Sequence, residues 1–374
     1  MNDNIIIRKA NFSDELQVIE LWKRNNLINK NPKNNWKMIW IDNPFYQENF
    51  PIGWVIESEN KILGYIGNIP LIYHFNNKKI RAVAARGFVV DKKARNYSLK
   101  LVSYFFSQKN IDLFLITTSN ESASNIYSKF GAQPLPLANY KSIFYWITNI
   151  KDVLKNILIN KLKIPKTLSN IITFFLYPFC FIILTFAEKY NYKNKKQWNG
   201  EIKFLSINDI SEEFNDFWIK TKTNSNMLLA DRSLEVLKWH YKNTESIRDN
   251  IKVISAYLNN KLVGYAFINI ENLPNSNTFK RIRIIDLITI DDNISIVNTL
   301  IFKVIEFAKT QNVHSVMLVG LPEHLKNQVL NTKPLIRKLK YMPFWFMSLK
   351  EKISSDLSHK ENWYPVHYDG DSNL

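Results

Sequence analysis

Residues 87–132 contain the side chains whose types and spacing are best suited to chemistry. A polar loop, residues 91–97, joins a predicted strand to a predicted helix that starts near Ser98, and it carries Arg95. Free N–H groups at a helix N-terminus bind anions, and an arginine adds positive charge to such a site. This loop is therefore a candidate anion-binding site.

A second pattern follows the next predicted strand, residues 113–117. It reads Asn120-x-x-Ala123-x-x-x-Tyr127-x-Lys129-x-Gly131. The order of strand, arginine-containing loop, helix, strand and this pattern resembles the coenzyme-binding core of the GNAT acyltransferases (GCN5-related N-acetyltransferases). The resemblance extends over most of residues 4–150 and, more weakly, over about 202–350. It implies an α/β (α+β) fold with two GNAT-like mixed-sheet domains.

The resemblance also implies a role for each part of this core. Acetyl-CoA or another acyl-CoA would be the co-substrate, and no metal would be needed. Tyr127 would protonate the leaving thiolate while an acceptor amine or hydroxyl attacks the thioester directly. Asn120 would hydrogen-bond the pantetheine arm. The other expected cofactor-binding groups belong to the backbone, at Phe88, Val89 and Val90 for the arm and at Arg95, Asn96, Tyr97 and Ser98 for the pyrophosphate.

The loop departs from the family's pattern of Arg/Gln-x-x-Gly-x-Gly/Ala. Here it reads Arg95-Asn96-Tyr97-Ser98-Leu99-Lys100, and none of the nine glycines of the 374-residue chain lies between Phe88 and Phe130. Glycine lets a backbone approach phosphate closely. Two interpretations therefore stay open. Either the N-terminal copy binds acyl-CoA, or Tyr127 is a core aromatic, Arg95 is a solvated cation and the chain is a catalytically inactive scaffold.

Similar segments occur twice in the chain. Residues 60–65, NKILGY, recur as residues 260–265, NKLVGY. In each copy a tryptophan, Trp40 or Trp239, precedes the glycine of this motif by 24 or 25 residues. An apolar stretch with helical spacing precedes each tryptophan, and a strand-like run follows it. The shared order and spacing indicate a duplicated domain.

The second copy has a weaker core. Its loop, residues 288–293, carries Asp291 and Asp292 where the first copy has Arg95. Because acidic side chains repel phosphate, we expect only the first copy to bind the coenzyme. Asp286, on the fourth strand of the second copy, is a candidate substrate contact or base. The alternative is a structural salt bridge from Asp286 to Arg281 or Arg283.

These patterns divide the chain into four parts. We predict an N-terminal GNAT-like domain (1–150), a basic apolar linker (151–200), a degenerate C-terminal GNAT-like domain (201–350) and a tail (351–374). The tail is aromatic and acidic, and if it docks it would place Asp369 or Asp371 at a cleft.

The net charge of +17 is concentrated in one region. Residues 141–200 hold ten lysines and two acidic residues, which gives 10 − 2 = +8, and they include the apolar run 171–187 with Pro178 at its centre. A run of seventeen residues is at the lower limit for a membrane span, and proline kinks a helix. Three interpretations stay open: attraction to an anionic membrane surface through residues 161–196, a buried linker helix, or a span. Charge gathered around an apolar run favours a membrane surface over nucleic acid as the partner.

Composition narrows the function further. A single cysteine excludes a disulfide framework and a cysteine-rich zinc site, and the six histidines have no metal-ligand spacing. The first residues do not form a secretory signal, so we expect a cytoplasmic protein, peripheral on the inner face of the membrane if the linker binds lipid. We expect an acyltransferase that moves groups other than aminoacyl groups to a small-molecule acceptor, a sugar, lipid-linked sugar or amino-sugar, as in polysaccharide biosynthesis. The alternative enzyme is a Fem-type protein that transfers an aminoacyl group from tRNA.

Overall fold

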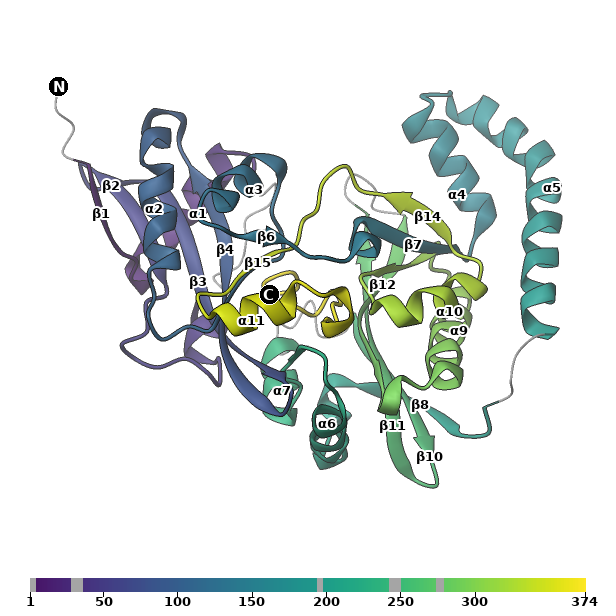
Figure 1. Cartoon of the computed structure of the whole chain (residues 1–374). Coiled ribbons are helices and arrows are strands. Elements are labelled where there is room, and N and C mark those ends of the chain that lie inside the picture. Colours follow the sequence, from purple (N-terminus) through teal and green to yellow (C-terminus); the bar gives the residue numbers. More distant parts are fainter. Residues whose placement is uncertain (1–4, 28–35, 194–197, 242–249, 274–278) are drawn as a thin grey trace. The chain divides into compact units, whose positions relative to one another are not determined.

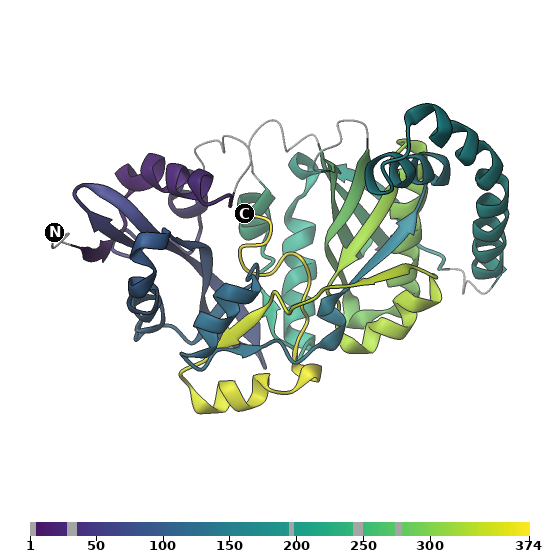
Figure 2. The same cartoon turned by 90° about the horizontal axis from the view of Figure 1, so that it is seen from above.

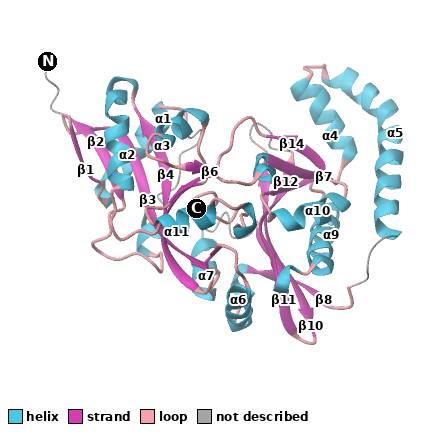
Figure 3. Cartoon of the chain, viewed as in Figure 1, coloured by secondary structure: helices cyan, strands magenta, loops and turns pink. Residues whose placement is uncertain are grey.

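The computed structural model of the chain describes residues 5–27, 36–193, 198–241, 250–273 and 279–374 (Figure 1). It consists of two compact units, and each unit is assembled from separate segments of the sequence. The first unit comprises Met1–Lys141, Ser225–Asn243 and Lys340–Leu374, and the second comprises Ser142–Asn224 and Thr244–Leu339. Each unit is built around one mixed β-sheet (Figure 3).

The sheet of the first unit has the order β1-β2-β3-β4-β5-β15-β6, and the short strand β9 also pairs with β3. Its strands β1 to β4 are antiparallel neighbours, whereas β4 and β5 are parallel. The bounds are β1 (Ile6–Lys9), β2 (Gly53–Ser58), β3 (Lys61–Phe75), β4 (Lys78–Val90), β5 (Leu113–Ile116), β6 (Gln133–Pro134), β9 (Leu229–Ala230) and β15 (Trp345–Met347).

Helices cover both faces of this sheet because side chains alternate along its strands. On β3, Ile66 packs in the core cluster that includes Phe105 of α2. Its neighbour Tyr65 points to the other face, where it contacts Trp22 of α1 and stacks on Trp36. The helices of this unit are α1 (Glu15–Arg24), the π-helix η2 (Lys37–Ile41), the 3-10 helix η3 (Lys92–Tyr97), α2 (Ser98–Phe106), α3 (Glu121–Ser128), α7 (Leu234–Tyr241) and α11 (Glu351–Leu357).

The repeated motif begins at a tight hairpin turn in each unit. Glu59 and Asn60 join β2 to β3 with φ of 50° and 59°, and Asn259 and Asn260 join β10 to β11 with the same two angles. Two-residue hairpin loops of this type need positive φ at both positions, and asparagine tolerates that conformation better than most residues. Asparagine thus occupies hairpin positions where glycine is common, which fits the low glycine content.

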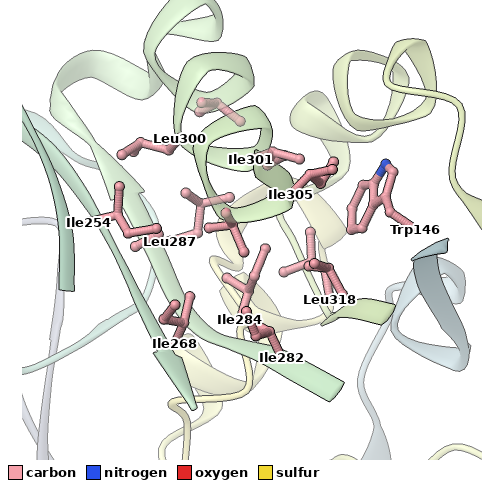
Figure 4. Close-up of a cluster of buried hydrophobic side chains, with 14 of the residues drawn as sticks. Trp146, Ile254, Ile268, Ile282, Ile284, Leu287, Leu300, Ile301, Ile305 and Leu318 are labelled. Atoms are coloured by element: carbon pink, nitrogen blue, oxygen red, sulfur yellow. The ribbon is translucent and has the colours of Figure 1, made fainter. Parts of the chain in front are cut away.

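The sheet of the second unit has the order β14-β7-β13-β12-β11-β10-β8. The long helix α9 packs across it, and Figure 4 shows Ile301 and Leu300 of α9 beside Ile254 and Leu287 of the sheet. The strands are β7 (Ser142–Ile147), β8 (Glu201–Ser206), β10 (Ile251–Leu258), β11 (Lys261–Asn272), β12 (Lys280–Thr289), β13 (Ser315–Val319) and β14 (Leu335–Lys338). The helices are α4 (Ile150–Asn156), the π-helix η5 (Ile157–Lys161), α5 (Lys166–Lys193), α6 (Glu212–Asn224), α9 (Ile294–Thr310) and α10 (Lys326–Asn331).

Two strands, β7 and β15, do not pair in the sheet that their order in the chain predicts. β7 would close the first domain by sequence order, but it pairs with β13 and β14 in the second sheet. β15 would close the second domain, but it pairs with β5 and β6 in the first sheet. The tail and α7 also belong to the first unit. The compact units therefore differ from the predicted ranges 1–150 and 201–350, because a strand's apolar pattern requires a partner without specifying which sheet supplies it.

Most of the described residues of the predicted linker are helical. It forms α4, η5 and α5, and α5 contains Pro178 within its 28 residues. Within the described part of the chain, none of the helices has both the length and the apolar character that crossing a membrane requires.

Candidate functional site

The strands β4 and β5 pair over a short stretch and then separate. Residues 82–84 pair in parallel with residues 113–115. Beyond this point Arg86, Val89 and Val90 pair with β3, and no strand in the described part of the chain pairs with their other edge. An unpaired strand edge can bind an extended ligand as an added strand. This open edge contains the backbone groups of residues 88–90, at which the sequence predicts the pantetheine contacts.

Gly87 shapes this open edge. The register between β3 and β4 shifts here, and Gly87 has a φ of 58°. Its carbonyl accepts a hydrogen bond from Trp22 Nε1 at 2.9 Å. A Cβ atom on Gly87 would lie 2.5 Å from the Trp22 ring. A positive φ and a close neighbour both require glycine at this position.

The predicted anion loop is helical. Residues 92–97 form the 3-10 helix η3, which runs directly into α2, and the Ser98 N–H donates to the Arg95 carbonyl. Because a 3-10 helix uses its interior N–H groups in its own hydrogen bonds, the open N–H groups lie at its start, at Lys92 and Lys93. Without glycine the loop winds as a right-handed helix, so the N–H groups predicted to bind pyrophosphate, from Arg95 to Ser98, are placed inside a helical run.

The same segment carries a cluster of cations. Lys92, Lys93, Arg95 and Lys100 are exposed, and none of the four forms an ion pair within the described residues. The preceding acid, Asp91, is bound by Arg24 at 2.7 Å. Burial alone would raise the pKa of Asp91, but hydrogen bonds from Arg24 and Asn25 outweigh it and hold this pKa below its usual value. The cluster therefore keeps a net positive charge and can attract phosphate groups.

Tyr127 lies beside the open edge of β4. It is buried, with its ring centroid 5.6 Å from that of Phe88 and 6.1 Å from that of Phe106. Burial raises the pKa of Tyr127, and the nearby carboxylate of Asp371 raises it further. Tyr127 thus holds its proton at neutral pH and can act as a proton donor.

Asn120 has a structural role that the sequence pattern did not reveal. It caps α3, with its side-chain oxygen accepting the N–H of Ala123 at 2.9 Å. The cap uses Oδ1, so Nδ2 is the group that remains for a contact with a pantetheine arm.

The tail docks against the end of β5. Asp371 accepts hydrogen bonds from Thr117 Oγ1 at 2.7 Å and from Thr118 Oγ1 at 3.2 Å. Gly370 has a φ of 65°, and a Cβ there would lie 2.4 Å from Thr117. Burial raises the pKa of Asp371, and the nearby Arg86 and the hydroxyl donors offset this only in part. The structure thus places a buried carboxylate of raised pKa at the end of β5, within electrostatic reach of Tyr127.

Asp369 has a different set of contacts. Its Oδ1 accepts the Tyr73 hydroxyl at 2.9 Å, and its Oδ2 accepts the backbone N–H of Val366 at 2.7 Å. The second bond closes a turn within the tail. Asp369 therefore helps to hold the tail in its docked conformation.

A small pocket borders the docked tail. Asp231, one of the residues that line this pocket, lies 2.8 Å from His74. Burial would raise the pKa of Asp231, but hydrogen bonds from His74 and Ser233 outweigh it and lower this pKa. The sequence did not predict this pair, because the two residues are 157 positions apart and share no motif. The pocket is lined by Phe45, Leu71, Ile72, Tyr73, Ala230, Asp231, Val236, Trp239, His240, Tyr368 and Gly370.

His240 gives this unit a specific dependence on pH. Its ring is buried 4.2 Å from the Tyr368 ring, and burial, followed by the nearby Arg232 and His367, lowers its pKa to about 3. Below about pH 6.5 the unfolded chain binds a proton at this residue that the folded protein does not bind. We therefore expect His240 to remove about 2 kcal/mol of folding free energy between pH 7 and pH 5.

Urea denaturation at the two pH values, with His240→Gln beside the wild type, measures this effect. The glutamine variant cannot titrate, so its stability should fall less over the same interval. Equal pH dependence of the two proteins would contradict a neutral His240 in the folded state.

Asp286 lies in the second unit and is fully buried on β12. Arg283 binds Glu271 at 2.7 Å, and Arg281 binds Glu271 as well. Asp286 on β12 pairs with Phe267 on β11. At the equivalent position of the first unit, Arg86 on β4 pairs with Gly67 on β3. The two copies thus place opposite charges at equivalent positions, and the substrate role of Asp286 stays a prediction.

The loop of the second copy is short and acidic. Asp291 and Asp292 have φ of 50° and 48°, and Asp292 lies 2.9 Å from His324. Asn293 caps α9 with its own side chain. Cations do not cluster here as they do at residues 92–100. Among the described residues, no group of three or more His, Cys, Asp or Glu side chains is placed to hold a metal ion.

No family model matches the sequence, and no curated protein matches it. Solved structures do share the fold. A GCN5-related N-acetyltransferase from Anabaena variabilis has a TM-score of 0.58 and 11% identity, over 93% of this chain and 73% of that one. A conserved protein of unknown function from Enterococcus faecalis, described as a probable N-acyltransferase, has a TM-score of 0.57 and 10% identity, over 92% and 72%. N-myristoyltransferase from Saccharomyces cerevisiae, with bound myristoyl-CoA, has a TM-score of 0.53 and 11% identity, over 100% and 85%.

These likenesses confirm the predicted fold. The chain has the GNAT fold, with two mixed α/β sheets that correspond to two GNAT-like domains. Sequence identities of about 10% show a shared fold and do not by themselves show a shared activity.

Proposed function

We propose that the first unit transfers an acyl group from acyl-CoA to an amine or hydroxyl group by direct attack on the thioester. The observation that carries this proposal is the separation of β4 from β5, which leaves the β4 edge at residues 88–90 open beside Tyr127. An extended pantetheine arm can pair with such an edge. The acyl group would then lie near the two proton-carrying side chains, Tyr127 and Asp371.

The cations of η3 and α2 support binding of the donor's phosphates. Lys92, Lys93 and Arg95 are exposed and follow directly on the open β4 edge. Charge-assisted hydrogen bonds from these side chains would replace the close backbone contacts that a glycine-rich loop provides. The residues present therefore fit a phosphate-bearing donor by charge.

Asp371 and Tyr127 supply the two proton transfers that the reaction needs. As the acceptor nitrogen or oxygen bonds to the thioester carbon, Asp371 takes the proton that the acceptor loses. As the carbon–sulfur bond breaks, Tyr127 gives its proton to the leaving sulfur. Asp371 then returns its proton to Tyr127, so both residues regain their starting states. The raised pKa of Asp371 suits a base, and Tyr127 carries its proton at neutral pH.

A small pocket lies beside the tail that carries the proposed base. Its wall contains Gly370, which is next to Asp371 in the chain, and the aromatic residues Tyr73, Trp239 and Tyr368. We propose a sugar, lipid-linked sugar or amino-sugar as the acceptor, and acyl groups other than aminoacyl groups as the cargo.

Calorimetric titration with acetyl-CoA and with a longer acyl-CoA tests the donor. Arg95→Ala, and Lys92→Ala with Lys93→Ala, should each weaken binding about tenfold or more, because each removes charged hydrogen bonds to phosphate. Lys78→Ala with Lys79→Ala is the matched control, since these lysines belong to the β3–β4 hairpin. If the wild type binds neither acyl-CoA, the donor is wrong. Binding of aminoacyl-tRNA instead would favour the Fem-type alternative, and binding of neither donor would leave a scaffold.

A further inference from the structure

The helix α5 has an inverted distribution of side chains. Its buried residues include Ser169 and Thr173, which are 0% and 3% exposed. These two polar residues lie one turn apart on one face, and α5 contacts α4 and η5. Three of its phenylalanines are exposed instead: Phe174 is 75%, Phe175 65% and Phe179 69% exposed.

This arrangement is opposite to that of an ordinary surface helix. A helix in a water-soluble protein turns its apolar stripe to the core and its polar side chains to solvent. Figures 1 and 2 both show α5 with α4 beside it at the outside of its unit. A large exposed apolar surface of this kind is typical of an interaction site. Its large exposed side chains are Leu168, Ile171, Phe174, Phe175, Leu176, Phe179 and Ile182.

The charge around α5 indicates what covers this surface. Lys163 and Lys166 are exposed at the start of the helix, and residues 141–200 carry the excess of +8. A second copy of this chain would bring the same positive charge against it. An anionic lipid surface offers both hydrocarbon for the phenylalanines and negative headgroups for the lysines.

We propose that α5 docks the protein on an anionic membrane surface. The helix lies in the plane of the interface, with its exposed apolar side chains in the hydrocarbon boundary and its N-terminal lysines at the headgroups. Pro178 within α5 suits a helix that lies on the surface, since no helix of the described residues is fit to cross. A membrane-bound position would bring the first unit to acceptors that carry a lipid, although docking does not depend on the proposed activity.

Sedimentation of the full-length protein with vesicles tests this inference. The wild type should sediment with phosphatidylcholine vesicles that contain about 30% phosphatidylserine, and about tenfold less with pure phosphatidylcholine. Phe174→Ser with Phe175→Ser and Phe179→Ser should lower sedimentation about tenfold or more, because these side chains supply the apolar contact. The matched control is Leu335→Ser with Ile336→Ser, which removes exposed apolar side chains from β14 and should bind like the wild type.

Three outcomes would overturn the inference. In the first, the wild type does not sediment with anionic vesicles. In the second, the phenylalanine variant sediments as well as the wild type. In the third, the wild type binds no vesicles but forms a dimer in analytical ultracentrifugation, and the phenylalanine variant does not form this dimer. Circular dichroism of the variant confirms that it is folded. Its titration with acyl-CoA tests the proposed function separately, because the substituted residues belong to the second unit.

Discussion

Replacing Asp371 by asparagine is expected to lower kcat for acyl transfer about 10²- to 10³-fold, while acyl-CoA affinity stays within about twofold. Asparagine keeps the shape of the side chain and can still bond to Thr117 and Thr118, so the tail should stay docked. It cannot take a proton from the acceptor. A base that acts in the transition state affects kcat much more than donor binding. Release of CoA thiol in the presence of an amino-sugar panel measures the rate, and calorimetry measures the affinity.

The pH profile separates a base from a structural residue. For the wild type, kcat/KM should fall on the acidic side at a pH above about 3.9, the ordinary carboxyl value, because the pKa of Asp371 is raised. This limb should be absent in Asp371→Asn. The matched control is Asp369→Asn, which removes a carboxylate of the same tail that bonds to Tyr73 and Val366. Comparable loss of rate in both variants, or an unchanged rate in Asp371→Asn, would reject Asp371 as the base.

Gly87→Ala should destabilise the protein by about 3 kcal/mol, and it should also weaken acyl-CoA binding. The left-handed backbone at Gly87 is strained for alanine, and the added Cβ would press on the Trp22 ring, so two costs add. Relief of this contact would move β4 at the point where it leaves β5. Urea denaturation gives the free energy of unfolding, and titration gives the affinity.

Gly131→Ala serves as the control for the backbone effect alone. Gly131 also has a positive φ, of 87°, but a Cβ there meets nothing within 4 Å. Its substitution should therefore cost about 1 kcal/mol. Equal losses in Gly87→Ala and Gly131→Ala would show that the packing of Trp22 against the bulge contributes little.

Much of the local structure follows from short-range patterns. The apolar spacing of residues 294–310 predicts a helix, and α9 has these bounds; the apolar run 315–319 predicts a strand, and β13 has these bounds. The repeated motif correctly predicts a hairpin and strand in both copies, because turn residues and side-chain alternation act over a few positions. The N-x-x-A-x-x-x-Y pattern falls on α3, and Tyr127 of that helix is buried.

The loop before α2 shows where a family pattern is insufficient. The sequence order predicts a loop whose N–H groups face a pyrophosphate, but without glycine residues 92–97 wind into a 3-10 helix. The positive charge is present in either conformation. From the folded backbone we expect the exposed side chains of Lys92, Lys93 and Arg95, more than interior N–H groups, to make the proposed phosphate contacts.

The sequence by itself determined that the chain has two similar α/β domains, one with a basic loop and a tyrosine at a coenzyme-like core and one with an acidic loop. Residue type, spacing and local periodicity carry that information. The tertiary structure alone decided that β7 pairs in the second sheet and β15 in the first. It also decided that His74 contacts Asp231 and that the tail docks Asp371 on Thr117 and Thr118. These contacts join residues far apart in the chain, and they depend on which buried partners satisfy a strand edge or a carboxylate, which no local pattern records.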